Sequence, residues 1–106
     1  MNSVQKFMPY AKPSYRLSNI AVEDLTRIHQ YGVKTFGTAA ADAYLDQFFN
    51  HFERIASRPW AFEEVPHIRP GYRRCICGVD SIYFREHRTK VEIIAIIGRQ
   101  DFSSRF

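Results

Sequence analysis

Long apolar runs, a secretion signal and a set of cysteine pairs are all missing from this 106-residue chain, and each absence excludes a class of protein. No apolar run approaches the length of a membrane span, and the N-terminus lacks the apolar core of a signal peptide. Two cysteines are too few for the disulfide framework of a small secreted protein. We therefore expect a soluble protein of the cytoplasm.

The two cysteines, Cys75 and Cys77, lie in a strand-like run and would share one face of it. Their side chains would be roughly 6–7 Å apart along the strand, which is too far for a disulfide bond to form easily. A Cys-x-Cys pair can form half of a metal site, but the chain has no second pair and its four histidines are scattered. We expect buried free thiols, and neither a metal ion nor a cofactor.

The chain does have enough apolar sequence for a core. Its length corresponds to one domain, and 45% of its residues are hydrophobic. Pro9 and Pro13 discourage regular structure near the N-terminus. We expect a flexible leader over residues 1–13 and a single domain over residues 14–106.

All of the net charge lies in the last third of the chain. Residues 1–66 carry 7 Lys/Arg and 7 Asp/Glu, whereas residues 67–106 carry 8 and 4, which accounts for the net charge of +4. Arginine outnumbers lysine by 11 to 4, and arginine is the better residue for bidentate recognition of carboxylate or phosphate groups. The pattern indicates either an anionic partner, nucleic acid or acidic protein, or an ordinary solvated basic surface.

The N-terminal part predicts one short strand and a helix. The strand is expected over Ser14–Leu17, and the helix over Ile20–Phe36 with Ser18 or Asn19 as its cap. Asp24 lies in an early turn of this helix, where the helix dipole favours negative charge.

A second helix is expected to follow at once. Gly37 ends the first helix, Thr38 caps the next one over about Ala39–Ser57, and Pro59 ends it. So short a link folds the two helices into an antiparallel hairpin. Each helix has one apolar face: Ala21, Leu25, Ile28 and Gly32 on the first, and Ala41, Leu45, Phe48, Phe52 and Ile55 on the second.

Three strand-like runs then follow, with short turns at residues 78–80 and 86–89. Residues expected to share a face are Arg73, Cys75 and Cys77 on the first strand, Ile82 and Phe84 on the second, and Val91, Ile93, Ala95 and Ile97 on the third. Ile94 and Ile96 make the other face of the third strand apolar too, which is typical of a central strand.

These elements predict an α+β fold. The three C-terminal strands form an antiparallel meander, and the helical hairpin packs on one face of it because each amphipathic element needs a partner. The N-terminal strand is expected to join the sheet beside the last strand.

Several segments stand in a recognisable order along the chain: Leu17-Ser18, Phe36-Gly37, Phe52-Glu53-Arg54-Ile55-Ala56, Ile68-Arg69-Pro70-Gly71-Tyr72-Arg73, Ile82-Tyr83-Phe84-Arg85 and Gly98-Arg99-Gln100-Asp101. Their order and spacing, over about residues 14–102, resemble the RelE/ParE superfamily of toxins, and within it the ParE branch. The resemblance implies a type II toxin–antitoxin toxin that inhibits DNA gyrase and is neutralised by a ParD-like antitoxin, whose C-terminal segment wraps the toxin. RelE-like relatives share the fold and cleave messenger RNA on the ribosome, which is the alternative function.

The residues favour a protein-binding poison without catalytic residues over a ribonuclease. A ribonuclease needs a basic surface for RNA and a proton-transfer group near the scissile phosphate. The second helix carries three carboxylates against one arginine: Asp42, Asp46 and Glu53 against Arg54. His67 and His87 are isolated residues in expected loops, which is more typical of solvated than of catalytic histidines.

The arginines are then expected to bind protein. The candidate antitoxin- or target-binding residues are Arg69, Tyr72, Arg73, Arg74, Arg85, Arg99 and Asp101. An apolar groove between helices and sheet would take apolar anchors of the antitoxin. Alternatively, Arg85 pairs with Asp101 inside the fold, and Arg73 or Arg74 is only solvated.

Trp60 and Phe62 are either core residues or exposed anchors.

The expected partners are a ParD-like antitoxin and DNA gyrase, with no membrane contact and no sequence-specific binding of nucleic acid by the chain alone.

Overall fold

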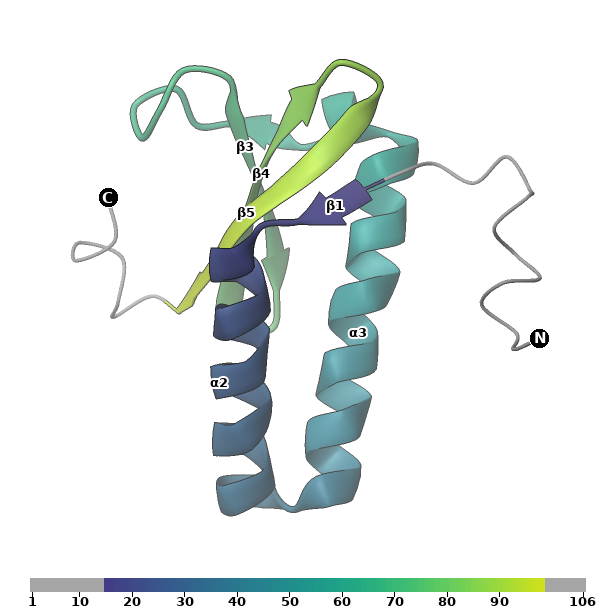
Figure 1. Ribbon diagram of the computed structural model, residues 1–106, viewed down its shortest axis with the longest axis vertical. Coiled ribbons are helices and arrows are strands. Elements are labelled where there is room, and N and C mark those ends of the chain that lie inside the picture. The colour runs from purple at the N-terminus through teal and green to yellow at the C-terminus, as the bar shows by residue number, and fades with distance from the viewer. Residues whose placement is uncertain (1–14, 99–106) are drawn as a thin grey trace.

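Two long helices and a five-stranded sheet make up the computed structural model, which describes residues 15–98 (Figure 1). The elements in chain order are strand β1 (Tyr15–Leu17), helices α2 (Asn19–Phe36) and α3 (Thr38–Ser57), the 3-10 turn η1 (Pro59–Ala61), and strands β2 (Glu63–Glu64), β3 (Tyr72–Cys77), β4 (Asp80–His87) and β5 (Lys90–Gly98). The sheet order is β1-β5-β4-β3-β2. β1 runs parallel to β5, and every other pairing is antiparallel. The predicted α+β fold is confirmed, including the first strand beside the last.

Strand β2 was not predicted, because two adjacent glutamates have no strand-like pattern. Glu63 and Glu64 pair with Arg74 and Arg73 of β3 along the backbone, and their carboxylates also meet these two arginines. Opposite charges facing each other across two strands stabilise such a pairing. A short edge strand therefore forms from residues that would be unfavourable in a central one.

The two helices begin and end close to the predicted residues. Ser18, not Asn19, caps α2, and its Oγ accepts a hydrogen bond from the backbone N–H of Ala21 at 3.0 Å. Thr38 is not a cap, because it is the first residue of α3 and Gly37 precedes the helix with a φ of 94° and no side-chain cap. That left-handed φ explains why a glycine links the helices. Neither helix in residues 15–98 is long and apolar enough to cross a membrane.

The main core lies between the helices and one face of the sheet, as predicted. The apolar stripes of α2 and α3 meet β3, β4 and β5 there, and the fully buried side chains include Phe48, Phe52, Ile55, Ile82 and Phe84. Full burial of a side chain of this size contributes about 1.5–3 kcal/mol. This core, rather than intrinsic helix propensity, is the main source of stability for the helical hairpin.

The predicted faces of β5 are wrong for its second half. Ala95 and Ile97 lie on the sheet face opposite the helices, whereas Ile96 joins Val91 and Ile93 in the main core. The cause is a register shift: Tyr83 pairs with Ala95 but the next residue, Phe84, pairs with Ile93, so Ile94 is an extra residue. Such a β-bulge reverses the alternation of side chains beyond it.

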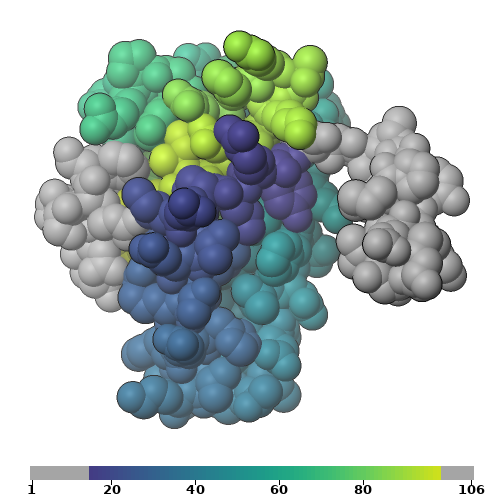
Figure 2. Space-filling view, in the orientation of Figure 1, coloured from purple at the N-terminus to yellow at the C-terminus, as the bar shows by residue number. Residues whose placement is uncertain are grey.

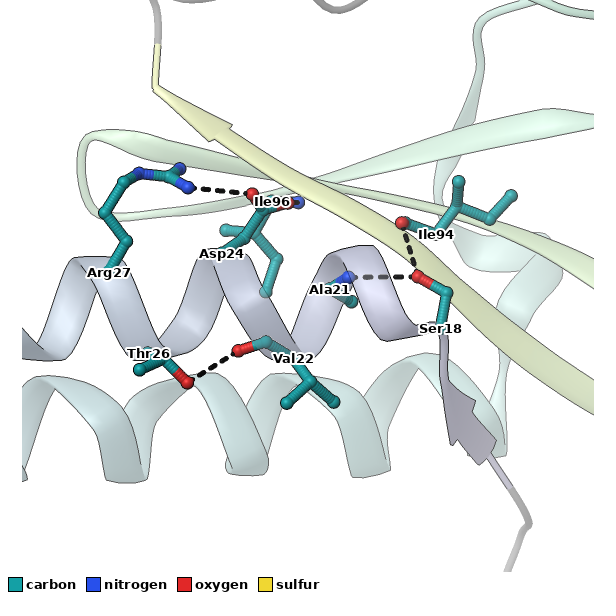
Figure 3. Close-up of polar contacts among 8 residues, drawn as sticks. All are labelled: Ser18, Ala21, Val22, Asp24, Thr26, Arg27, Ile94 and Ile96. Atoms are coloured by element: carbon teal, nitrogen blue, oxygen red, sulfur yellow. Dashed lines mark hydrogen bonds and ion pairs between the residues drawn. The ribbon is translucent and has the colours of Figure 1, made fainter.

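At this bulge, side chains of α2 replace β1 as the neighbour of β5 (Figure 3). β1 pairs with β5 only as far as Ile93, whose carbonyl accepts from the N–H of Ser18. The Ser18 hydroxyl then donates to the carbonyl of Ile94 at 2.7 Å, and a carboxylate oxygen of Asp24 accepts from the N–H of Ile96 at 2.9 Å. Since a buried, unpaired backbone group is costly, these contacts fix α2 against the sheet.

Asp24 therefore does more than the helix-dipole role expected from sequence. Its side chain is buried, with 1% of the residue exposed, and its second oxygen accepts a hydrogen bond from Arg27 at 3.0 Å. An ion pair and two hydrogen bonds offset the cost of burying this carboxylate.

Tyr44 of α3 holds the turn between β3 and β4. Its hydroxyl lies 2.8 Å from a carboxylate oxygen of Asp80 and 2.9 Å from the carbonyl of Cys77, beside the β3–β4 turn. Burial, with a smaller effect from the hydrogen bond to Asp80, holds the pKa of Tyr44 well above its ordinary value. Gly78 in this turn has a φ of 60°, and a Cβ placed there would lie 2.6 Å from the Tyr44 hydroxyl.

We expect Asp24→Ala to lower the free energy of unfolding by about 1–3 kcal/mol, because the N–H of Ile96 loses its acceptor inside the protein. Asp24→Asn keeps a side-chain oxygen and should cost less. Urea unfolding of both variants measures this, with the exposed neighbour Glu23→Ala as control. An Asp24→Ala protein as stable as the Glu23→Ala protein would contradict the assigned role.

We expect Gly78→Ala to destabilise the protein more than Gly71→Ala, by about 1–3 kcal/mol. Both glycines have a positive φ, so both substitutions place an alanine in the left-handed region. Only at Gly78 does the added Cβ collide with another side chain, whereas no atom lies within 4 Å of that position at Gly71. Thermal unfolding of the two variants isolates the contact with Tyr44, and equal melting temperatures would disprove its effect.

Candidate functional site

The face of the sheet opposite the two helices is called the helix-free face below. Three charged side chains form a row on it across β1, β5 and β4. Alternation places Arg16, Glu92 and Arg85 opposite one another there, because their neighbours along each strand enter the main core. Glu92 pairs with both arginines: Nε of Arg85 lies 2.9 Å from one carboxylate oxygen, and Nη2 of Arg16 lies 3.5 Å from the other. One carboxylate between two guanidinium groups leaves this row with one net positive charge.

Arg74 extends the basic surface on the same face. It pairs with Glu63 at 2.7 Å, and this carboxylate, with a smaller contribution from Tyr83, raises the pKa of the Arg74 guanidinium against the opposing effect of burial. Tyr72 lies beside it and packs on a second, smaller core that covers this face, formed by Val65, Tyr83, Ala95 and Ile97. Tyr72 is half-buried beside Arg74, whereas the four residues of this second core are buried.

Arg73 does not belong to this surface. It lies on the helix side of β3 with Cys75, where its Nη1 donates to the carbonyl of Phe62 at 2.7 Å and its Nη2 lies 3.5 Å from Glu64. The candidate binding arginines of the sheet are therefore divided between its two faces.

The other predicted residues lie at the ends of these elements or beyond them. Arg69 is exposed in the loop before β3, where a turn through Pro70 and Gly71 closes with a hydrogen bond from the N–H of Tyr72 to the carbonyl of Arg69. Arg99 and Asp101 lie outside the described residues, so the alternative Arg85–Asp101 pair stays untested, although Arg85 does pair with Glu92.

The prediction of an apolar groove between helices and sheet is wrong, because core side chains fill that space. A groove on the described surface instead runs along the C-terminal half of α3, and five of its seven lining residues are polar in type: Asn50, Glu53, Arg54, Ser57, Arg58, Ala61 and Phe62.

Two of the histidines lie on the helices, away from the arginines of the helix-free face. His29 contacts Asp42 between the two helices at 2.7 Å, and His51 contacts the carbonyl of Gln47 on α3. His67 is exposed in its loop, and His87 is exposed at the end of β4 rather than in a turn. Within residues 15–98, no three His, Cys, Asp or Glu side chains converge as they would around a metal ion.

Comparison with known proteins connects this geometry to a family. A sequence profile described as "ParE toxin of type II toxin-antitoxin system, parDE" matches residues 15–101. The chain belongs to the ParE toxin family. It is 34% identical over 83 residues to Toxin ParE1 of Caulobacter vibrioides, which covers 78% of this chain and 85% of that protein.

A solved structure of another ParE-type system supports the fold. The structure titled "Chromosomal ParDE TA system from P. aeruginosa" matches with a TM-score of 0.72 and 19% identity, covering 82% of this chain and 96% of the other. At this identity the likeness concerns the arrangement of helices and strands, and it agrees with the fold expected for a ParE toxin.

The two thiols of this ParE toxin are buried in its main core. Cys75 and Cys77 are free, as predicted, and both face the helices. Burial, with smaller effects from Cys75 and Asp80, raises the pKa of the Cys77 thiol to about 11. Since the thiolate is the reactive form, both groups are poor nucleophiles near neutral pH.

We expect Cys77 to make the protein less stable as the pH rises from about 9 to about 11. In this window the unfolded chain loses the thiol proton near its ordinary pKa of 9.0, while the folded protein keeps it up to about pH 11. The unfolded state then binds fewer protons, so the free energy of unfolding falls with pH, by up to about 1–3 kcal/mol. Urea unfolding between pH 8 and 11 measures the slope.

Cys77→Ala is the matched variant for this measurement. It should be less stable at pH 8 because it leaves a small cavity, but it should lose less stability between pH 9 and 11. Parallel pH profiles for the two proteins would show that Cys77 is not the group responsible.

Proposed function

We propose that this member of the ParE toxin family inhibits DNA gyrase by binding it, and that a ParD-like antitoxin neutralises it. The observation that most supports the proposal is the family match over residues 15–101, together with a relative named a ParE toxin over most of its own length. DNA gyrase acts in the cytoplasm, so the proposal also assigns the chain to that compartment.

Binding rather than catalysis accounts best for the arginines. Arg73, Arg74 and Arg85 each pair with a glutamate inside the fold, so their guanidinium groups are held in place and partly neutralised. A ribonuclease would need such cations beside a general acid or base, and His29 and His51 lie on the helices, away from these arginines. The exposed carboxylates Asp42, Asp46 and Glu53 on α3 would also repel RNA.

We assign the antitoxin to the helix-free face of the sheet. Arg69, Tyr72, Arg74 and Arg85 offer cations and an aromatic ring for an acidic, apolar segment, with Arg16 added by the structure. Each guanidinium has five N–H donors, so an arginine that already binds one glutamate can also donate hydrogen bonds to a second carboxylate, from a partner. Arg73 lies on the other, helix-covered side of β3, and Arg99 and Asp101 remain candidates by sequence position alone.

The purified chain is expected to inhibit supercoiling of relaxed plasmid by DNA gyrase, and the antitoxin is expected to restore it. Arg85→Ala should weaken antitoxin binding about tenfold, because a charge-assisted contact is lost. Lys34→Ala, which removes an exposed cation near the end of α2, is the matched control and should bind as the unchanged chain does.

Two results would count against the proposal. Unchanged supercoiling combined with cleavage of messenger RNA in a translating extract would favour the ribonuclease alternative. Equal antitoxin affinity for Arg85→Ala and Lys34→Ala would remove the helix-free face as the antitoxin site while leaving the gyrase activity in place.

A further inference from the structure

A second surface lies at the tip of the β4–β5 hairpin, where it meets the η1 turn. One small hollow there is lined by residues of both segments: Ala56, Pro59, Trp60, Glu86, Arg88, Thr89, Lys90 and Val91. In Figure 2 the lime-green hairpin tip stands at the upper edge of the molecule. We call Trp60, Arg88 and Lys90 the tip patch.

Trp60 is an exposed anchor and not a core residue, which decides a question that the sequence left open. Its exposed fraction is 63%, whereas Phe62 is half-buried and packs edge-on against Phe84 at 5.8 Å. Pro59 and Val91, which line the same hollow, are buried and give it an apolar floor. Tryptophan over an apolar floor with charged residues at the rim is the usual composition of a binding hot spot.

Arg88 has an unfavourable backbone conformation for its residue type. Its φ is 59°, and the other positive φ values among residues 15–98 belong to Gly37, Gly71 and Gly78. Glycine or asparagine would occupy this position with less strain, so arginine lowers stability here. Strained residues of this kind often serve binding sites.

The charges of the hollow indicate the partner. Arg88 and Lys90 outweigh Glu86, so the lining carries net positive charge around the indole ring. Such a surface suits an acidic protein segment that also presents an apolar side chain to Trp60.

Trp60 meets the helix side of the β4–β5 hairpin, where Glu86 and Val91 line the same hollow. Arg85 of the proposed antitoxin site pairs with Glu92 on the helix-free side. Partners of Trp60 and of Arg85 can therefore approach the hairpin from different sides. We propose that the tip patch contacts an acidic, apolar segment of the topoisomerase target, an inference that rests on the proposed function.

The test compares inhibition of gyrase supercoiling, antitoxin affinity and melting temperature for Trp60→Ala. The concentration needed for half-inhibition should rise about 30-fold or more, as for a hot-spot residue. Antitoxin affinity should stay within about twofold, and the melting temperature within about 3 °C, because the side chain is exposed. Tyr31→Ala is the matched control, since Tyr31 is an aromatic residue with 64% exposure on α2, outside the tip patch, and its loss should leave inhibition unchanged.

Arg88→Gly and Arg88→Asn separate binding from stability. Both relieve the left-handed strain and remove the charge, so the melting temperature should stay equal or rise by up to about 5 °C. Inhibition of gyrase should nevertheless weaken about fivefold. A lower melting temperature with unchanged inhibition would show that Arg88 serves the turn and not a partner.

The remaining outcomes also decide the inference. Full inhibition by Trp60→Ala, or an equal loss in Tyr31→Ala, overturns it while the proposed function stands. A parallel loss of antitoxin affinity would assign the tip patch to the antitoxin instead. Absence of inhibition by the unchanged chain would overturn the proposed function and, with it, gyrase as the partner of this patch.

Discussion

Ser18 and Asp24 join the start of α2 to β5 at the point where β1 ends, and the rest of the arrangement depends on that junction. The same serine ends the strand, caps the helix and binds the carbonyl of Ile94. Asp24 then takes the N–H of Ile96, beyond the bulge. With α2 fixed there, the Gly37 link brings α3 back along the same face, and the main core closes between the hairpin and the sheet.

Sequence periodicity was enough to predict both helices, four of the five strands and the position of β1 beside β5. Periodicity failed to predict the structure where a tertiary contact overrides the alternation of side chains along a strand. The bulge at Ile94 cannot be read from a run of consecutive isoleucines, since either register keeps apolar side chains on both faces. β2 exists because Glu63 and Glu64 meet Arg74 and Arg73, pairings between residues eleven and nine apart that no local pattern reveals.

The candidate site was only partly predictable for a related reason. The sequence correctly indicated arginine on the sheet, but Arg73 and Arg74 are consecutive and therefore face opposite sides, and the carboxylates that hold the arginines could not be assigned. An aromatic residue in a short loop drew attention to Trp60, but the sequence alone could not decide whether its side chain is exposed. Only the meeting of η1 with the distant β4–β5 turn shows that it lies beside Arg88.

The outer strands of the sheet are very short. β1 has three residues, and β2 has two, which are both glutamates, so within residues 15–98 the outermost strands themselves offer little backbone for a further strand to pair with. Exposed sheet edges are where further copies of a chain add and aggregates grow. For the gyrase-binding role proposed above, such short outer strands favour a chain that stays dispersed over one to which further copies add edge to edge.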